Sequence, residues 1–571
     1  MIARSLSWPA TRSFASSLSP ETRRLIVLAL VAAATMAPML LWGIPSNRDL
    51  SNHFRFALPF HDALRSGHFY PGWLAEANHG FGDASFRFYP PALYYLLALT
   101  RTLAGNWYAA TIITFSALSV LGAIGVYFWA REFGSSELAM WAGILYAVAP
   151  YHLNQFFQAV MLAEFAGAAV LPFAFAFTER ICKHRRRRDV AGLAAAYAVL
   201  ILTHLPLAVI GSIALAAYAL LRADRKTRSA TLLCLASSIA LGLAASACYW
   251  TTMLIELNWI RADNVDPEPG MDYRQNFVLS TFSPDFVNVW WMNILLLGTV
   301  AMFWPALALL SGRVHASGRS QNYASKPIKA LAVLLLLAIF MATPASRPLW
   351  NLIHPLQETQ FPWRWLSITS MVCPILLALA IPFWTRLAKG KKRPLVIIAL
   401  GTIAISFAFS AGHIVREARW LTPAQFEQTL SSIPGSPSVY QWLPVWVHDP
   451  LPHMTAAVEA GDRQLTIKSW EPERRIFQVG AGAATDARVQ TFFYPHWQAS
   501  AEGQALAIRP DQNGAMVIAL PKEAATITLE FHEPKRVRYA AGLTLIGWVL
   551  IGGLLLKRRS KNSLPLSIDY A

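Results

Sequence analysis

The chain has 571 residues, of which 55% are hydrophobic and only 14% are charged. A soluble protein of this length needs far more charge to cover its surface, so the composition indicates a polytopic membrane protein. The formal net charge of +17 does not indicate nucleic-acid binding, because the basic residues gather in short loops and no basic face on a soluble domain is evident.

Apolar blocks near the length that spans a bilayer, about 20 residues, predict about 12 transmembrane helices. We read the first block as a retained helix, since it is longer than a signal-peptide core. Short basic loops follow several of these blocks, and the positive-inside rule assigns them to the cytoplasm together with both chain termini. The basic stretches are "KHRRRRD", "RADRKTR", "RLAKGKKR" and "KRRSK". The expected spans are about 25–43, 109–130, 137–150, 157–178, 190–203, 205–221, 230–252, 290–311, 329–343, 366–385, 395–412 and 540–556.

Two polar positions stand out among these spans. The segment 190–221 runs from one basic loop to the next, so it must cross the membrane an even number of times. "THLP" is its turn signal, which predicts a hairpin of two short helices with His204 at the outer surface. Glu164 is expected about two turns inside an apolar helix, where a charge costs about 2.5–3.5 kcal/mol. A functional site and a structural ion pair both account for that cost.

The last outer region changes character. Runs such as "RQLTIKSW", "MVIAL" and "ATITLEF" alternate apolar and polar residues and are separated by turn signals, including "DQNG". We expect a transmembrane domain at 1–412, an extracytoplasmic β-sandwich within 413–539, and a final helix with a cytoplasmic tail at 540–571. Within "FFYPHWQA", Tyr494, His496 and Trp497 suit either stacking on a sugar ring or packing in the sandwich core.

The first outer loop, at about 44–108, gathers polar and aromatic residues beside the membrane. Apolar residues at helical spacing predict an interfacial helix after residue 48, and "ALYYLLAL" predicts a second one. The stretches "GHFYPGW" and "NHGFGDASFRFYPP" between them are typical of tight loops. An aromatic belt accounts for the Trp and Tyr residues but not for the acids and histidines. These are Asp49, His53, Asp62, Glu76, His79 and Asp83.

An acid directly after the first helix, followed by two interfacial helices, resembles the GT-C glycosyltransferase superfamily. The stretch "RDLSNHFRFALPFHDALRSGHFYPGWLAEANHGFGDASFRFYPP" is similar to bacterial membrane proteins named 6-pyruvoyl-tetrahydropterin synthase-related, which resemble YfhO-type proteins. "MLAEFAGAAVLPFAF", "QFPWRWLSI" and "FFYPHWQASAEGQAL" fit the same pattern. The resemblance implies a bacterial inner-membrane enzyme that moves a sugar from a polyprenyl-phosphate donor to an envelope glycan or lipid acceptor. Nothing in the chain resembles the soluble pterin enzyme.

That reaction needs a base for the acceptor hydroxyl, and Asp49 at the helix exit suits this role. Capping of the following helix is the alternative for Asp49. His53, one helical turn later, is placed to orient Asp49 or the acceptor. Because the next acid is Asp62, the paired carboxylates that hold a metal in many GT-C enzymes are missing, and we expect no cofactor, with a divalent cation as the alternative. The residues assigned to substrate binding are Arg48, Asp62, Glu76, Asn78, His79, Arg87, Tyr89, Glu164, His204, Arg274 and Arg364.

Two other functions stay open on the sequence alone. One is a transporter or flippase of lipid-linked sugars, and the other is a non-catalytic protein of envelope polysaccharide assembly. A transporter places its polar residues near the bilayer midplane. In this chain they collect in the outer loops, which favours chemistry at the membrane surface.

Overall fold

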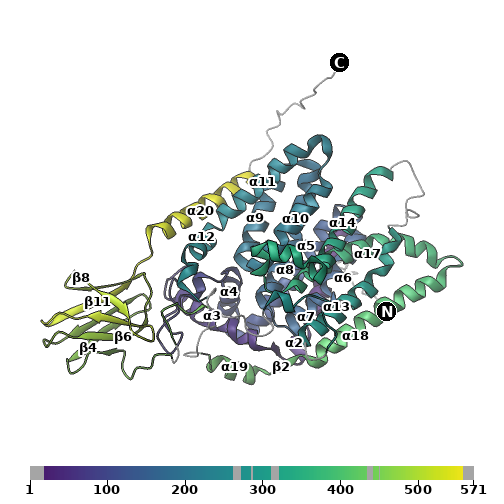
Figure 1. Cartoon of the computed structure of the whole chain (residues 1–571). Helices are drawn as coiled ribbons and strands as arrows, with labels where there is room; N and C mark the ends of the chain where they lie inside the picture. Colours follow the sequence, from purple (N-terminus) through teal and green to yellow (C-terminus); the bar gives the residue numbers. More distant parts are fainter. Residues whose placement is uncertain are drawn as a thin grey trace, which may run out of the picture.

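The structure is a computed structural model that describes residues 18–261, 272–283, 287–309, 321–433, 442–448 and 451–556. The basic N-terminal segment before residue 18 and the "KRRSK" stretch therefore lie outside the described residues. A bundle of helices makes up most of the chain, and a β-sandwich lies at one end of it (Figure 1). Helices α3 and α4 lie between the bundle and the sandwich.

The described part of the chain contains 8 helices long and apolar enough to cross a membrane, or up to 9 if a pair bent by 86° counts as one span. This confirms the polytopic helical fold. The expectation of about twelve spans also counts shorter helices and stays a prediction. The long spans involve α5 (Trp107–Arg131), α8 (Leu162–His184), α10 (Leu205–Arg222), η3 (Arg225–Thr227) with α11 (Arg228–Ala245), α13 (Val287–Phe303) with η6 (Trp304–Leu309), η9 (Pro362–Trp365) with α17 (Leu366–Ala388), α18 (Arg393–Glu417) and α20 (Lys535–Leu556). The bent pair joins α14 (Gln321–Ala342) to η8 (Pro344–Ser346) and α15 (Arg347–Leu352). The shorter helices are α1 (Pro20–Ala34), α2 (Pro38–Leu41), α6 (Ser136–Ala147), α7 (Pro150–Phe157), α9 (Arg187–Thr203), α12 (Ala247–Glu256), η4 (Leu257–Trp259), η5 (Tyr273–Gln275) and α16 (His354–Gln357).

The predicted hairpin and the predicted position of Glu164 have different outcomes. Helix α9 ends at Thr203 and α10 begins at Leu205, so the hairpin is confirmed, and His204 accepts a hydrogen bond from the Leu207 N–H at 3.3 Å. The position of Glu164 was wrong: α7 and α8 are separate helices, and Glu164 lies in the first turn of α8. The chain leaves helical geometry between them, with Val160 at a φ of 55°. The first turn of a helix favours an acid, because the N-terminal end carries partial positive charge.

The first outer loop follows the predicted order. Helix α3 (Arg48–Arg65) comes first, and η2 (Ser85–Arg87) and α4 (Ala92–Ala104) follow the glycine-bearing loops. Strand β1 (Ile44–Ser46) pairs antiparallel with β2 (Arg419–Leu421), which joins the start of α3 to the chain just after α18. Helix α19 (Pro423–Ser431) begins with a capping box at Thr422 and packs on α3, where the rings of Phe54 and Phe426 lie 5.3 Å apart.

The strand-rich region is a sandwich of two antiparallel sheets with one core, as predicted. One sheet has the order β3-β6-β10-β9 and the other β4-β5-β11-β7-β8. The inward residues Val489 and Ile518 of the first sheet meet Phe477 and Leu529 of the second. The strands begin at Val458, later than the expected boundary at 413, because α18, β2 and α19 belong with the helical part. They are β3 (Val458–Glu459), β4 (Leu465–Trp470), β5 (Arg474–Val479), β6 (Asp486–Phe492), β7 (Trp497–Ala501), β8 (Gln504–Leu506), β9 (Ile508–Pro510), β10 (Ala515–Ala519) and β11 (Ala525–Phe531).

The first outer loop completes the sandwich core. Trp73, Phe81 and Ala84 belong to the same buried cluster as the strands, and the Phe81 ring stacks on that of Phe492 at 5.3 Å. The Phe492 N–H also donates a hydrogen bond to the carbonyl of Phe81 at 2.7 Å. A segment that follows the first helices of the chain is therefore fixed to a domain close to its end.

Candidate active site

The start of α3 brings the proposed catalytic acid next to a buried histidine. Asp49 is half-buried in the first turn of the helix. His53 lies one turn later and is buried, and its Nδ1 is 3.0 Å from the hydroxyl of Tyr94 on α4. Burial lowers the pKa of His53 to about 4, so the imidazole is neutral at pH 7 and acts as a hydrogen-bonding group rather than a cation.

Tyr89 marks the point where the side chains of distant segments meet. Burial raises the pKa of its hydroxyl, and the charge of Asp49 raises it further, while Arg364 opposes the rise. The charge of Glu164 acts on the same hydroxyl. The charges of Asp49, Glu164 and Arg364 therefore all reach one phenol. One site is thus shared by four segments: the loop before α4 and the starts of α3, α8 and α17.

Glu164 and Arg364 form a buried ion pair. Arg364 Nε donates to Glu164 Oε2 at 2.9 Å, and another Arg364 nitrogen donates to the carbonyl of Thr359. The side chain of Glu164 is 1% exposed, and its Oε1 accepts a hydrogen bond from Tyr151 at 2.7 Å. The guanidinium also lies over the ring of Phe361, 4.7 Å from its centroid. Both charges are matched, which is the condition for keeping an ion pair out of water.

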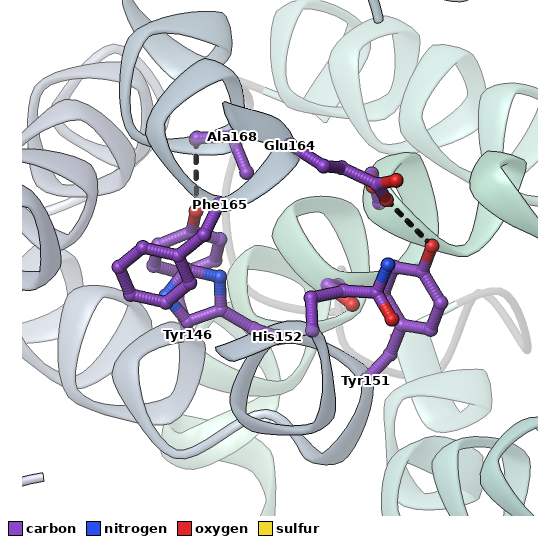
Figure 2. Close-up of a pocket in the computed structure, with 9 residues that line it drawn as sticks. Tyr146, Tyr151, His152, Glu164, Phe165 and Ala168 are labelled. Atoms are coloured by element: carbon purple, nitrogen blue, oxygen red, sulfur yellow. Dashed lines mark hydrogen bonds between the residues drawn. The ribbon is translucent and has the colours of Figure 1, made fainter. Parts of the chain in front are cut away.

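A small polar cavity lies behind Glu164 (Figure 2). Its volume is about 10 Å³, which is room for about one water molecule. Figure 2 shows Tyr151 reaching Glu164 on one side of the cavity, while the His152 ring packs between Tyr146 and Phe165 on the other. The Nε2 of His152 is buried with no hydrogen-bond partner among the described residues.

His204 joins the site from the predicted hairpin. It is buried, and the charges of Arg364 and His53 both act on it. Its Nδ1 accepts the Leu207 N–H, so His204 also ends α9 and begins α10. Of the residues that the sequence assigned to the site, the structure thus brings together Asp49, His53, Tyr89, Glu164, His204 and Arg364.

Arg87 lies in a different network, where the helical part meets the sandwich. Its guanidinium donates to both carboxylate oxygens of Glu256, at 2.6 and 2.9 Å, and also to Glu533. Tyr494 and His496 bond to the same Glu256 carboxylate at 2.8 and 2.9 Å. Burial alone would raise the pKa of Glu256, but hydrogen bonds from His496 and Arg87 hold it well below the ordinary value. Tyr494 and His496 are therefore interior groups of the domain junction.

The remaining assigned residues lie apart from the Tyr89 site. The side chain of Asp62 is 74% exposed on α3, and that of Arg274 is paired with Asp272 at 3.4 Å. Asn78 is buried and donates to the carbonyl of Gly82 at 2.9 Å, which shapes its own loop. Glu76 and His79 line a second cavity, described below. The side chain of Arg48 lies outside the part of the chain that the structure describes.

Several polar groups of the site were not predicted from the sequence. Tyr94, Tyr151 and Ser367 all contact its members, with the Ser367 hydroxyl 3.4 Å from Glu164. The signal available for Tyr94 was a hydroxyl inside the apolar run "ALYYLLAL", which an interfacial helix also explains. Over the described ranges, no group of three or more His, Cys, Asp or Glu side chains could hold a metal ion, so no residue is assigned to one.

This arrangement defines a polytopic membrane protein with a polar, largely buried site and a folded β-sandwich domain. The chain belongs to the membrane-protein family described as the 6-pyruvoyl-tetrahydropterin synthase related domain, whose model matches residues 86–414. The match covers more than half of the chain and begins after α3. No curated protein matches the chain in sequence.

Several solved membrane glycosyltransferases of the GT-C type are similar to this chain. The oligosaccharyltransferase of Archaeoglobus fulgidus has a TM-score of 0.46 at 12% identity, and the match covers 76% of this chain and 62% of that one. ArnT from Cupriavidus metallidurans, solved with undecaprenyl phosphate, has a TM-score of 0.36 at 13% identity, over 72% of this chain and 74% of that one. The arabinofuranosyltransferase AftD from Mycobacteria has a TM-score of 0.46 at 18% identity, over 72% of this chain and 28% of that one. The likeness concerns the fold, and at these values it says nothing about activity.

Proposed function

We propose that the chain is an integral membrane glycosyltransferase that moves a sugar from a polyprenyl-phosphate donor to an envelope glycan or lipid acceptor. The reaction takes place at the outer face of the bacterial inner membrane, with both chain termini in the cytoplasm. One observation carries the proposal: the charges of a carboxylate, Asp49, and a guanidinium, Arg364, both act on the half-buried phenol of Tyr89. A glycosyl transfer from a lipid phosphate needs both kinds of group, one for the acceptor proton and one for the leaving phosphate.

Asp49 is the base in this proposal. The acceptor oxygen forms a bond to the anomeric carbon as its proton passes to the Asp49 carboxylate, and the bond from that carbon to the phosphate oxygen breaks. The electron pair of the broken bond stays on the phosphate. The half-buried position of Asp49 in the first turn of α3 supports this role, because the carboxylate keeps some exposure while its charge acts on Tyr89.

Arg364 is the cation that faces the phosphate. Its Nε and one terminal nitrogen are engaged by Glu164 and Thr359, whereas Nη2 makes no hydrogen bond within the described residues. Glu164 holds the guanidinium in place and compensates its charge in a buried site. Among cationic side chains, Arg is suited to phosphate because its planar group presents several donors at once.

Two acids of α3 provide the test. Asp49→Asn should abolish complementation of a deletion strain, read as envelope glycans by mass spectrometry, because loss of a general base costs about 10²–10⁴-fold in rate. The matched control is Asp62→Asn, an exposed acid on the same helix, which should restore the glycan pattern. Equal thermal stability of the two purified variants excludes a folding defect. Normal glycans in the Asp49→Asn strain would overturn the enzymatic proposal and leave a transport or assembly role.

A further inference from the structure

A second cavity lies between the first outer loop and the sandwich, away from the ion pair of the site. Its volume is about 360 Å³, within the range of about 300–1,000 Å³ that small-molecule sites have. The polar and aromatic side chains that line it are Glu76, His79, Trp470, Glu471, Arg475 and Gln490. Most of them are polar, and an indole is among them.

The sandwich side of the cavity is the hairpin of β4 and β5. Trp470 and Arg475 pair across this hairpin, and the Arg475 guanidinium lies 4.5 Å from the centroid of the Trp470 ring. The same guanidinium lies 5.3 Å from the Trp497 ring and donates to the carbonyl of Gln490 at 2.8 Å. Glu473 at the hairpin tip accepts a hydrogen bond from the Gly72 N–H at 3.3 Å. The indole is therefore held in one orientation, half-buried, at the edge of the cavity.

The other side of the cavity is the tight loop of the first outer segment. Asn78 and His79 both have positive φ, of 54° and 57°, which turns the chain sharply between Glu76 and Gly80. The Gln490 side-chain amide donates to the His79 carbonyl at 2.7 Å, so this loop is joined directly to β6. The side chains of Glu76 and His79 are exposed on this loop. The cavity thus has a fixed shape before any ligand binds, which reduces the entropic cost of binding.

The charges select the ligand class. Arg475 is fully buried, and burial lowers its pKa to about 9, with Glu76 acting in the opposite direction. A buried guanidinium disfavours a cationic ligand, and the exposed carboxylates of Glu76 and Glu471 disfavour an anionic one. Carboxylate oxygens accept hydrogen bonds from hydroxyl groups, and an indole presents an apolar surface to the C–H face of a sugar ring.

We propose that this cavity binds an uncharged sugar unit of the acceptor glycan. The proposal rests on the proposed function, because it supplies that reaction with its acceptor. Trp470 contacts the ring face, and Glu76, Glu471 and Gln490 receive or orient the hydroxyl groups. Two residues of the cavity lining, Glu76 and His79, belong to the same first outer loop as Asp49, and α3, which begins next to Asp49, lies between the helical bundle and the sandwich (Figure 1).

The test is direct binding to the full chain in detergent, measured by saturation-transfer NMR and calorimetry. The probes are neutral tetrasaccharides of glucose, galactose, mannose and N-acetylglucosamine, with tetragalacturonate as the anionic probe. We expect at least one neutral probe to bind, and Glu471→Gln and Trp470→Phe to weaken it about tenfold or more. The matched control, Glu523→Gln, changes an exposed acid of the same sandwich that does not line the cavity, and should leave binding unchanged.

Asp49→Asn separates this proposal from the proposed function. It should abolish transfer while leaving the binding of the neutral probe intact. Binding to tetragalacturonate alone, binding to no neutral probe, or binding that survives both cavity variants would each overturn the sugar site. None of these results depends on whether Asp49 is the base.

Discussion

The junction between the helices and the sandwich provides the sharpest test of what holds the outer domain in place. Arg87 and Glu256 are buried, with side chains 2% and 0% exposed, and they share two hydrogen bonds of 2.6 and 2.9 Å. Arg87 also bonds to Glu533, beyond the last strand. We therefore consider Arg87→Met, which keeps much of the side-chain volume and removes the charge and every donor.

The expected loss follows from what Glu256 retains. Removing one partner of a buried ion pair costs about 3–5 kcal/mol, because the other charge is left without compensation. Glu256 still accepts from Tyr494, His496 and Arg536, at 2.8, 2.9 and 3.1 Å, so the lower value of about 3 kcal/mol applies. That free energy corresponds to about a hundredfold in the equilibrium for separating the sandwich from the outer loop.

Hydrogen exchange measures this opening at one amide. The Phe492 N–H, bonded to the Phe81 carbonyl across the junction, should lose about a hundredfold of its protection in Arg87→Met. The control is Arg474→Met, which breaks a pair of 3.0 Å with Glu530 whose side chains are 53% and 38% exposed, worth about 0–1 kcal/mol. Equal protection of that amide in the two variants, or no change in Arg87→Met, would refute the reasoning.

Two further predictions concern the first outer loop. Burial lowers the pKa of His53 from 6.5 to about 4. Between these pH values His53 is protonated more readily in the unfolded chain than in the folded one. The stability that neutral His53 contributes is therefore lost as the pH falls from 6.5 toward 4. At pH 5 the loss in free energy of unfolding is about 2 kcal/mol. His53→Gln should therefore make the thermal stability change less between pH 7 and pH 5. A pH dependence equal to that of the unmodified chain would contradict the lowered pKa of His53. Gly82, with a φ of 85°, has no room for a Cβ beside the Trp73 indole, whereas Gly503, with a φ of 83°, has nothing within 4 Å. Gly82→Ala should therefore destabilise the chain by about 1–3 kcal/mol more than Gly503→Ala in chemical denaturation, and equal losses would show that only backbone strain matters.

The sequence predicted the elements that periodicity and charge determine locally. Basic loops at both ends of the segment 190–221 require an even number of crossings, and the structure has the hairpin of α9 and α10. Alternating residues predicted the sandwich, because the side chains of a strand point to opposite faces. The first strand of the sandwich begins at Val458, after α18, β2 and α19, and the boundary expected at 413 stays a prediction.

Partners across long sequence distances could not be predicted. Arg87 and Arg364 look alike in the sequence, each an arginine among aromatic residues on the outer side. In the fold one binds Glu256 and Glu533 at the domain junction, and the other binds Glu164 beside Tyr89. The carboxylate that meets each guanidinium decides its role, and only the tertiary structure determines which carboxylate that is. For the same reason, the break that brings Glu164 to the start of α8 had no signal in the residues around it.

The segment from Ser85 to Tyr89 connects the two halves of the molecule. Arg87 is bonded into the sandwich junction, and two residues later Tyr89 contributes the phenol on which Asp49 and Arg364 act. Between them, the Phe88 carbonyl accepts a hydrogen bond from Tyr249 at 3.1 Å. Because Arg87 and Tyr89 are only two residues apart in this bonded segment, we expect a shift of the sandwich to move the phenol as well. A variant that loosens the junction should therefore impair the proposed site without touching it, and such a result would show that the sandwich helps to position that site.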